Sequence, residues 1–244
     1  MRKMHLMSYN IHKGMNIGNR KSVLSGLRQY IRYAKADVVF LQEVAGDARH
    51  DIDVSQFEYL ADSVWHHYAY GKNAVYDNRH HGNAILSKAP IVEWKNINIS
   101  TNRFEHRGIL HGVLYVKTKS QHAVEFHLLC LHLNLLESDR QKQLDLICQY
   151  VQTSVPEHSP LIVAGDMNDW RRKASYMLER ELTLKEAFKS SSGKYAKTFP
   201  SILPFLPLDR IYFRNCELES CSRLMTGSEK HLSDHIPLTA TFTW

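Results

Sequence analysis

Residues 37–44, DVVFLQEV, form a short apolar run that ends in a polar and an acidic residue. A second such run covers residues 4–11, MHLMSYNI, and apolar residues recur at helical spacing over 19–34 between the two. Short apolar runs bounded by polar residues are typical of strands. The pattern therefore predicts that the chain opens with a β–α–β unit.

Seven further apolar runs predict strands, and short connections between several of them favour antiparallel neighbours. They cover residues 84–87, 91–99, 109–117, 124–131, 161–165, 208–213 and 236–242. A second helix is predicted over 139–153, where Ser138 and Gln141 have the spacing of a capping box. Its apolar stripe consists of Leu144, Ile147, Cys148 and Val151. Many strands and few helices predict two sheets packed face to face with helices outside, in one domain over residues 1–244.

The composition bounds the class of protein. Hydrophobic residues make up 43% of the 244 residues and charged residues 23%, which excludes wholesale disorder. The net charge of +6 suits an anionic partner such as nucleic acid, a phospholipid headgroup or a phosphate ester. No apolar run approaches the roughly 18 residues of a membrane span. The opening residues lack a signal peptide's apolar run, so we expect the cytoplasm. The four cysteines have no C-x-x-C spacing, which predicts reduced thiols.

Polar and acidic residues recur at the ends of the predicted strands, where loops meet a rigid scaffold and functional sites are usually built. They are Asn10, Glu43, His132, Asn134, Asp166, Asn168, Asp209 and the run Ser233, Asp234 and His235. Each taken singly is more often a turn residue or a helix cap. Their recurrence favours one shared site. If the backbone stays extended, Asn168 points to the same side as Asp166.

These residue types fit one kind of chemistry. Hard divalent cations such as Mg²⁺ prefer carboxylate and amide oxygens, which Glu43, Asn10 and Asp234 could supply. A carboxylate close to His235 would stabilise its charged imidazole, and a charged imidazole can bind a phosphate that gains negative charge. Asp209 is the candidate for that carboxylate.

Seven segments in order along the chain carry a resemblance to a known family. They read SYNIHKG, LQEV, HGNAILSKAPI, LHLNLLESDRQKQL, VAGDMND, LDRIYF and SDHIPL. The series resembles the endonuclease/exonuclease/phosphatase family over residues 7–240. That family includes deoxyribonucleases, sphingomyelinases, inositol-polyphosphate phosphatases and tyrosyl-DNA phosphodiesterases. The resemblance implies a four-layer α/β/β/α sandwich of two mixed, mainly antiparallel sheets. It also implies a hydrolase of phosphoric ester bonds that depends on Mg²⁺, with Mn²⁺ as a possible substitute.

The resemblance also implies roles for the matching residues. Glu43 looks like the principal metal ligand, with Asn10 assisting and Asp234 in the metal and catalytic network. Asp166 resembles the residue that orients or deprotonates the attacking water, and Asn168 resembles its partner that binds the phosphate.

Two histidines complete the set of residues carried over from the family. His235 resembles the residue that contacts the scissile phosphate, Asp209 the carboxylate that orients it, and His132 a second histidine. Some members carry an Asp two residues after the first Asn, where this chain has His12, so the resemblance does not extend to that ligand.

DNA is the first substrate that the sequence favours, because the net charge suits a polyanion. Trp170 lies beside three basic residues at 171–173, which would suit a nucleic-acid track. The competing interpretation, which we expect, is a solvated helix start with Trp170 facing the core. Arg107 is a candidate phosphate contact, and the alternative is a solvated or salt-bridged arginine.

A phospholipid or an inositol phosphate is the alternative substrate. Residues 204–207, PFLP, precede Asp209 and would form an interfacial lip that touches lipid, although we expect a buried rim loop there. A third alternative is a catalytically dead binding protein, which the complete residue set disfavours. We expect a monomer without stable membrane insertion.

Overall fold

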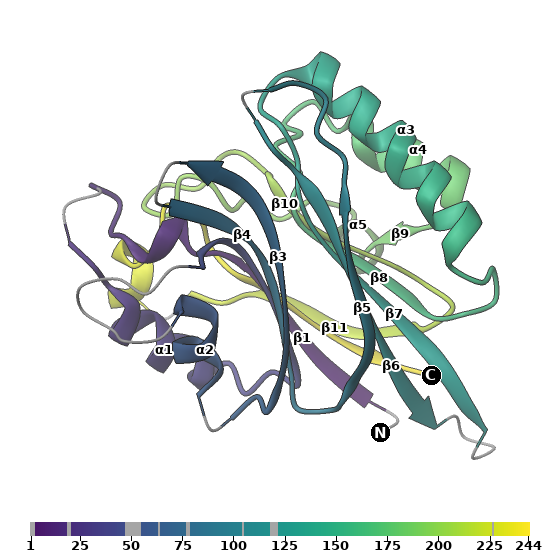
Figure 1. Ribbon diagram of the computed structural model, residues 1–244, viewed down its shortest axis with the longest axis horizontal. Coiled ribbons are helices and arrows are strands. Elements are labelled where there is room, and N and C mark those ends of the chain that lie inside the picture. The colour runs from purple at the N-terminus through teal and green to yellow at the C-terminus, as the bar shows by residue number, and fades with distance from the viewer. Residues whose placement is uncertain are drawn as a thin grey trace.

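The computed structural model describes residues 3–18, 21–46, 55–62, 64–76, 79–103, 105–117, 122–225 and 227–244. Two six-stranded sheets pack face to face, and helices cover their outer faces on both sides (Figure 1). The strand orders are β11–β12–β1–β2–β4–β3 and β5–β6–β7–β8–β10–β9. The predicted four-layer α/β/β/α sandwich is therefore confirmed.

The first sheet contains the amino-terminal and carboxyl-terminal strands. Its members are β1 (Lys3–Asn10), β2 (Val38–Ala45), β3 (His67–Tyr76), β4 (Arg79–Ser87), β11 (Glu217–Arg223) and β12 (Leu238–Thr243). Strands β1 and β2 are parallel and are connected through α1 (Leu24–Tyr33), which confirms the opening β–α–β unit. The other neighbouring pairs are antiparallel. Helix α2 (Gln56–Ala61) lies with α1 on the outer face.

Helix α1 begins later than the predicted start at residue 19. A 3₁₀ turn, η1 (His12–Gly14), precedes it, and Met15 forms an isolated antiparallel bridge with Ser22. The Val23 amide then donates to the Gly14 carbonyl at 3.0 Å. These bonds use backbone amide and carbonyl groups that a helix starting at residue 19 would need for its own hydrogen bonds. The helix therefore starts at Leu24.

The second sheet is also mixed. Its members are β5 (Ile91–Asn98), β6 (Gly108–Lys117), β7 (Ala123–His132), β8 (Leu161–Asp166), β9 (Lys185–Glu186) and β10 (Asp209–Arg214). Strands β7 and β8 are parallel, and the other neighbouring pairs are antiparallel. Helices α3 (Glu137–Ser154) and α4 (Lys173–Leu182) cover its outer face (Figure 1). The remaining elements are α5 (Ala187–Ser192) and η2 (Ser228–His231).

The predicted capping box of α3 is wrong, although the helix and its apolar stripe are confirmed. The helix begins at Glu137, two residues before the predicted start, and the N-cap position is Leu136, which makes no side-chain cap bond. Ser138 therefore lies inside the first turn. Glu137 and Asp139 place negative charge there, where it interacts favourably with the helix dipole. The predicted stripe residues Leu144, Ile147, Cys148 and Val151 are all buried.

Alternating side chains of the strands fill two kinds of core. Phe40 and Leu128 lie in the cluster between the sheets, whereas Leu41 and Leu129, one residue further on, pack beneath the helices. This two-residue period is what a strand buried on both faces requires. In the described part of the chain, no helix is long and apolar enough to cross a membrane.

The strand topology brings four strand ends to one edge of the sandwich. His132 at the end of β7 pairs with Asp166 at the end of β8, and Asp209 at the start of β10 pairs with the same Asp166. Asn10 at the end of β1 donates its side-chain amide to Asp166 across the sheets, at 3.2 Å. The edge where both sheets end is therefore where the predicted site residues meet.

Candidate active site

A buried histidine between two carboxylates forms the centre of this edge. His235 Nδ1 lies 2.8 Å from Asp209 Oδ2, and its Nε2 lies 3.6 Å from Asp166 Oδ2. Burial alone would lower the pKa of His235, but the two carboxylates more than offset it and raise the pKa to about 10. The imidazole is therefore a cation at neutral pH, as predicted from the pairing with Asp209.

The Asp166 carboxylate lies near His235, His132, Asn10 and Asn168. Burial raises its pKa to about 6, with the charge of His235 acting in the opposite direction. Its Oδ1 accepts from the Asn168 amide at 2.9 Å, and its Oδ2 lies 3.7 Å from His132 Nε2. At neutral pH it is ionised, and three groups already orient it.

Glu43 brings carboxylate oxygens close to Asp166, and the Asn10 amide lies between the two carboxylates. Asn10 Nδ2 lies 3.4 Å from Glu43 Oε1 and 3.2 Å from Asp166 Oδ2, so the amide bridges the two carboxylates. Lys13 Nζ lies 3.7 Å from Glu43 Oε2. The Glu43 side chain is 19% exposed, which leaves its carboxylate open to an ion that enters from solvent.

Backbone strain concentrates at this edge. His12, Lys13, Glu43 and Asn168 all have positive φ, at 48°, 57°, 56° and 48°. Such conformations cost free energy for residues with a Cβ, and they persist where the surrounding structure fixes them for a functional reason. The left-handed backbone at Asn168 also corrects the expectation of an extended chain. Asn168 contacts Asp166 through its backbone amide, while its side-chain amide donates to the Leu133 carbonyl at 2.9 Å.

Asp234 joins the site through His12. His12 Nδ1 lies 3.2 Å from Asp234 Oδ1, and the His12 backbone amide donates to Asn10 Oδ1 at 3.1 Å. Burial acts to raise the pKa of Asp234, but the hydrogen bond with His12 and the charges of His235 and His12 together outweigh it, and the pKa is lowered. The residue that replaces the family's Asp thus connects two of the three predicted metal ligands.

His132 and Arg107 form the third side of the site. Burial, together with the charge of Arg107, lowers the pKa of His132 well below its usual value, so this imidazole is neutral at pH 7. The Arg107 side chain is 11% exposed and lies 3.7 Å from Glu105, and its Nε is buried without a hydrogen-bond partner among the described residues. Arg107 is therefore an ion-paired residue at the site and not a solvated one.

Asp166, Asp209 and His235 each bring one potential ligand atom within 4.8 Å of one another and could hold a metal ion. His235 Nδ1 already lies 2.8 Å from Asp209 Oδ2, so an ion at this cluster would have to replace that contact. The donors around Glu43 and Asn10 are oxygens, which fit Mg²⁺ better.

Several residues that hold the centre in place went unrecognised in the sequence. The Phe199 ring lies 5.1 Å from the His235 ring, and Thr198 Oγ1 accepts from the Asp209 amide at 3.2 Å. His81 also belongs to the site: burial lowers its pKa to about 4, and the charge of Lys13 contributes. His81 is the first residue of the segment HGNAILS, but nothing in that segment of sequence marks it as a site residue.

Two expectations about the rim of the site are wrong. Trp170 is 42% exposed and does not face the core, because the Arg140 guanidinium lies over its ring at 4.7 Å. The helix start beside it is solvated as expected, since α4 begins at Lys173. The 204–207 segment is not a buried loop, because Phe205 is 57% exposed and its neighbour Leu203 is 74% exposed.

Comparison with known proteins gives a consistent result. A sequence profile described as the Endonuclease/Exonuclease/phosphatase family matches residues 7–235. The uncharacterized protein YbhP of Escherichia coli strain K12 is 41% identical over 96% of this chain and 94% of its own length.

Solved structures with low sequence identity share the fold. A functionally unknown conserved protein from Enterococcus faecalis V583 has a TM-score of 0.80 at 17% identity, over 98% of this chain and 99% of the other. D. rerio TDP2 complexed with single strand DNA product has a TM-score of 0.73 at 20% identity, over 99% of each chain.

Proposed function

Because the chain belongs to the endonuclease/exonuclease/phosphatase family, we propose that it is a metal-dependent phosphodiesterase. Membership makes it a phosphoesterase of that family. The observation that carries the finer proposal is the protonated His235, held between Asp209 and Asp166 next to the oxygens of Glu43 and Asn10. One cation and one group of hard oxygen ligands at a single edge suit a phosphate that gains charge during hydrolysis.

Glu43, Asn10 and Asp234 are the residues that would hold Mg²⁺ or Mn²⁺. When bound there, the ion would neutralise charge on the phosphate and on the leaving oxygen. The donor set fits, since Glu43 and Asp234 are carboxylates whose side chains are 19% and 23% exposed. Asn10 adds an amide that already contacts the Glu43 carboxylate.

The remaining side chains act on the water and the phosphate. Asp166, ionised above about pH 6, accepts a proton from the attacking water and orients it for in-line attack. His235 donates from Nε2 to a phosphate oxygen, and Asp209 fixes the ring through Nδ1. Neutral His132, Asn168 and Arg107 surround the same position and stabilise the pentacoordinate transition state.

DNA is the first substrate we propose. The net charge of +6 supports a polyanion, and a protein with the same fold, D. rerio TDP2, has been solved in complex with a single strand DNA product. The exposed Trp170 supports a strand that stacks at this rim, and the exposed side chains of Arg171 and Lys173, both ion-paired with Glu137, add positive charge beside it.

A phospholipid or inositol phosphate is the second candidate, favoured by one observation. Leu203 and Phe205 expose apolar surface immediately before the strand that carries Asp209. Apolar side chains at the entrance of a site suit a substrate that carries hydrocarbon.

A substrate panel tests both candidates. The purified protein is incubated with Mg²⁺, and in parallel with EDTA, against supercoiled plasmid, an abasic duplex, a bis-aryl phosphodiester and phospholipid vesicles. We expect the bis-aryl phosphodiester to be cut with Mg²⁺ and not with EDTA. Nicking of plasmid selects the nuclease, and its rate must fall steeply with salt. Headgroup release without nicking selects the phospholipid. No hydrolysis in any arm contradicts the proposed function.

A further inference from the structure

A short hairpin forms one wall of the site. In residues 199–206, Phe199 and Leu206 form an antiparallel bridge, and the Leu206 amide donates to the Phe199 carbonyl at 2.9 Å. Two contacts tie this hairpin to the catalytic residues: Phe199 packs against His235, and the Ser201 amide donates to the Asp234 carbonyl at 2.8 Å. A molecule that binds this hairpin would therefore lie beside His235 and Asp234.

The tip of the 199–206 hairpin is apolar and faces solvent. Ile202, Leu203 and Phe205 are 54%, 74% and 57% exposed, within four consecutive positions. Single exposed apolar side chains are ordinary, but a contiguous group of large ones marks a surface that binds something. The backbone bonds at the base of the hairpin and the contacts of Ser201 hold this group out from the protein.

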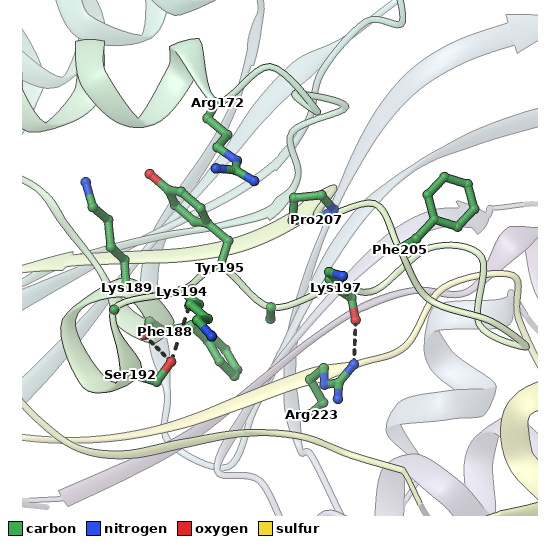
Figure 2. A pocket seen from close by; sticks show the side chains of 12 residues that line it. Arg172, Phe188, Lys189, Ser192, Lys194, Tyr195, Lys197, Phe205, Pro207 and Arg223 are labelled. Carbon is green, nitrogen blue, oxygen red and sulfur yellow. Dashed lines mark hydrogen bonds between the residues drawn. The ribbon is translucent and has the colours of Figure 1, made fainter.

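A cationic hollow of about 660 Å³ opens at the base of the same hairpin (Figure 2). Its charged residues are Arg172, Lys189, Lys194, Lys197 and Arg223, and none of the described residues that line it is acidic. Phe205 and Pro207 line its edge, so the apolar tip and the cations are continuous. Arg223 Nη1 donates to the Lys197 carbonyl at 3.0 Å, which fixes the position of this arginine.

Apolar residues are also exposed in the loops that follow β7 and β8. Leu135 and Leu136 follow the end of β7 and are 55% and 63% exposed, and Trp170 follows the end of β8. Because β7, β8 and the start of β10 meet at one edge, these residues and the hairpin lie along the same rim. Exposed apolar side chains therefore occur at several points along this rim, and the cations of the hollow adjoin one of them.

We propose that this rim docks on an anionic phospholipid bilayer, with the 199–206 tip inserted into the interface and the cations of the hollow at the headgroups. Apolar insertion combined with basic residues is the recognised chemistry of peripheral attachment to anionic membranes. A second copy of this chain fits less well, because two cationic hollows would repel each other.

Single-stranded DNA also fits less well than a bilayer. At the tip only Phe205 offers a ring on which a base can stack, since Ile202 and Leu203 are aliphatic. The Trp170 ring on the same rim already has the Arg140 guanidinium 4.7 Å from its centroid. The Tyr195 ring, which lines the hollow, already has the Arg210 guanidinium 4.5 Å and the Arg172 guanidinium 5.5 Å from its centroid. The docking inference goes beyond the proposed function, since a membrane-attached phosphodiesterase could cut either substrate.

Co-sedimentation with vesicles tests the inference in EDTA, so that binding is measured without turnover. Vesicles of phosphatidylglycerol and phosphatidylcholine are compared with vesicles of phosphatidylcholine alone. We expect binding to the anionic vesicles that weakens as salt is raised. The double variant Leu203→Glu with Phe205→Glu lowers the partition coefficient at least about tenfold, because it removes the inserted surface. The pair Lys194→Ala with Lys197→Ala lowers it by about fivefold per lysine.

Matched controls come from the opposite end of the sheets. Tyr115 on β6 is 59% exposed and lies far along the strand from the cleft, so Tyr115→Glu adds the same kind of charge at an equally exposed site. Lys3→Ala with Lys117→Ala removes the same charge as the lysine pair, at the far ends of β1 and β6. Unchanged thermal midpoints show that the hairpin variants are folded.

Three outcomes overturn the inference: no binding to anionic vesicles, equal losses in the control variants, or binding of single-stranded DNA that the lysine pair weakens while vesicles are not bound. The last outcome would assign the hollow to nucleic acid. Because no arm requires hydrolysis, failure of the proposed function leaves this test intact, and the reverse also holds.

Discussion

The candidate site around Asp166 and the 199–206 hairpin are neighbours with opposite anomalies: charged residues are buried in the first, and apolar residues are exposed in the second. In the cleft, Asp166 and Asp209 are 2% and 1% exposed, although carboxylates are rarely buried. In the hairpin, Leu203 is 74% exposed. The buried charges are compensated by partners within the fold, whereas the exposed leucine has no such compensation. The contrast shows that the buried carboxylates find their partners within the chain, whereas the exposed apolar side chains of the hairpin would be covered only by a binding partner.

Removal of a cleft carboxylate gives the largest expected effect. Asp166→Ala should lower kcat by about 10³-fold or more, because no other group accepts the proton of the attacking water. The thermal midpoint should change little, because the substitution removes a buried charge and, acting in the opposite direction, the contacts of Asp166 with Asn168 and Asn10. Turnover of a bis-aryl phosphodiester and a thermal melt measure the two quantities. Asp145→Ala, at an exposed position of α3, is the control, and turnover near that of the control would refute the role of Asp166.

The packing between the sheets should be the next most sensitive. Leu128 is 0% exposed in the cluster that joins both sheets, so Leu128→Ala should lower the free energy of unfolding by about 3 kcal/mol. Urea denaturation measures this loss in the free energy of unfolding. Since Leu128 lies outside the site, kcat should stay unchanged at temperatures where the variant is folded. A loss below about 1 kcal/mol would mean that the sheets are not held by this cluster.

The pH dependence tests how Asp209 acts on His235. Hydrolysis should rise through about pH 6 as Asp166 loses its proton, and fall through about pH 10 as His235 loses its proton. Burial acts to lower the pKa of His235, and Asp209 is the largest influence that raises it. Asp209→Asn should therefore move the alkaline limb to lower pH and reduce kcat about 100-fold, since the amide still holds the ring but not its charge.

The acidic limb of the Asp209→Asn pH profile should also move to lower pH, by less than the alkaline limb. The negative charge of Asp209 adds to burial in raising the pKa of Asp166, so its loss lets Asp166 ionise at lower pH. Glu186→Gln is the matched control, because Glu186 is also buried and caps α5 away from the imidazole. An Asp209→Asn profile that keeps its alkaline limb in place would show that this carboxylate does not set the charge of His235.

The same two regions show what the sequence can and cannot predict. That Glu43, Asp166 and Asp209 lie close together was predictable because each stands at the end of an apolar strand, where a polar residue breaks the local pattern. The conformation of Asn168 was not predictable, because its left-handed backbone depends on hydrogen bonds to Asp166 and Leu133. The link from His12 to Asp234 was missed for the same reason, since it joins residues far apart in sequence.

Elements with irregular patterns were also missed. Strand β3 (His67–Tyr76) interrupts its apolar residues with Gly71, Lys72 and Asn73, and the register with β4 shifts between Lys72 and Ala74. A bulge of this kind breaks the two-residue period on which strand prediction depends. Only the start of helix α4 was expected and not its bounds, because the left-handed Arg172 provides no side-chain cap to mark them.

The hairpin was misread because apolar residues between prolines look the same whether or not another element covers them. Exposure is decided by tertiary packing, and the expectation of a buried loop assumed a cover that the fold does not supply. Trp170 was misread in the same way. The sequence identified the residues of both regions, and only the structure showed which were buried.

The smallest expected effect is therefore the most direct test of the hairpin. Leu203→Ala should change the free energy of unfolding by less than about 0.5 kcal/mol, because an exposed side chain loses little packing. Urea denaturation beside Leu128→Ala gives the contrast within one protein. A cost above about 1 kcal/mol would mean that Leu203 packs within the folded chain, and the docking surface would lose its tip. A neutral result, together with weaker partition into anionic vesicles, would show that the leucine contributes to binding and not to folding.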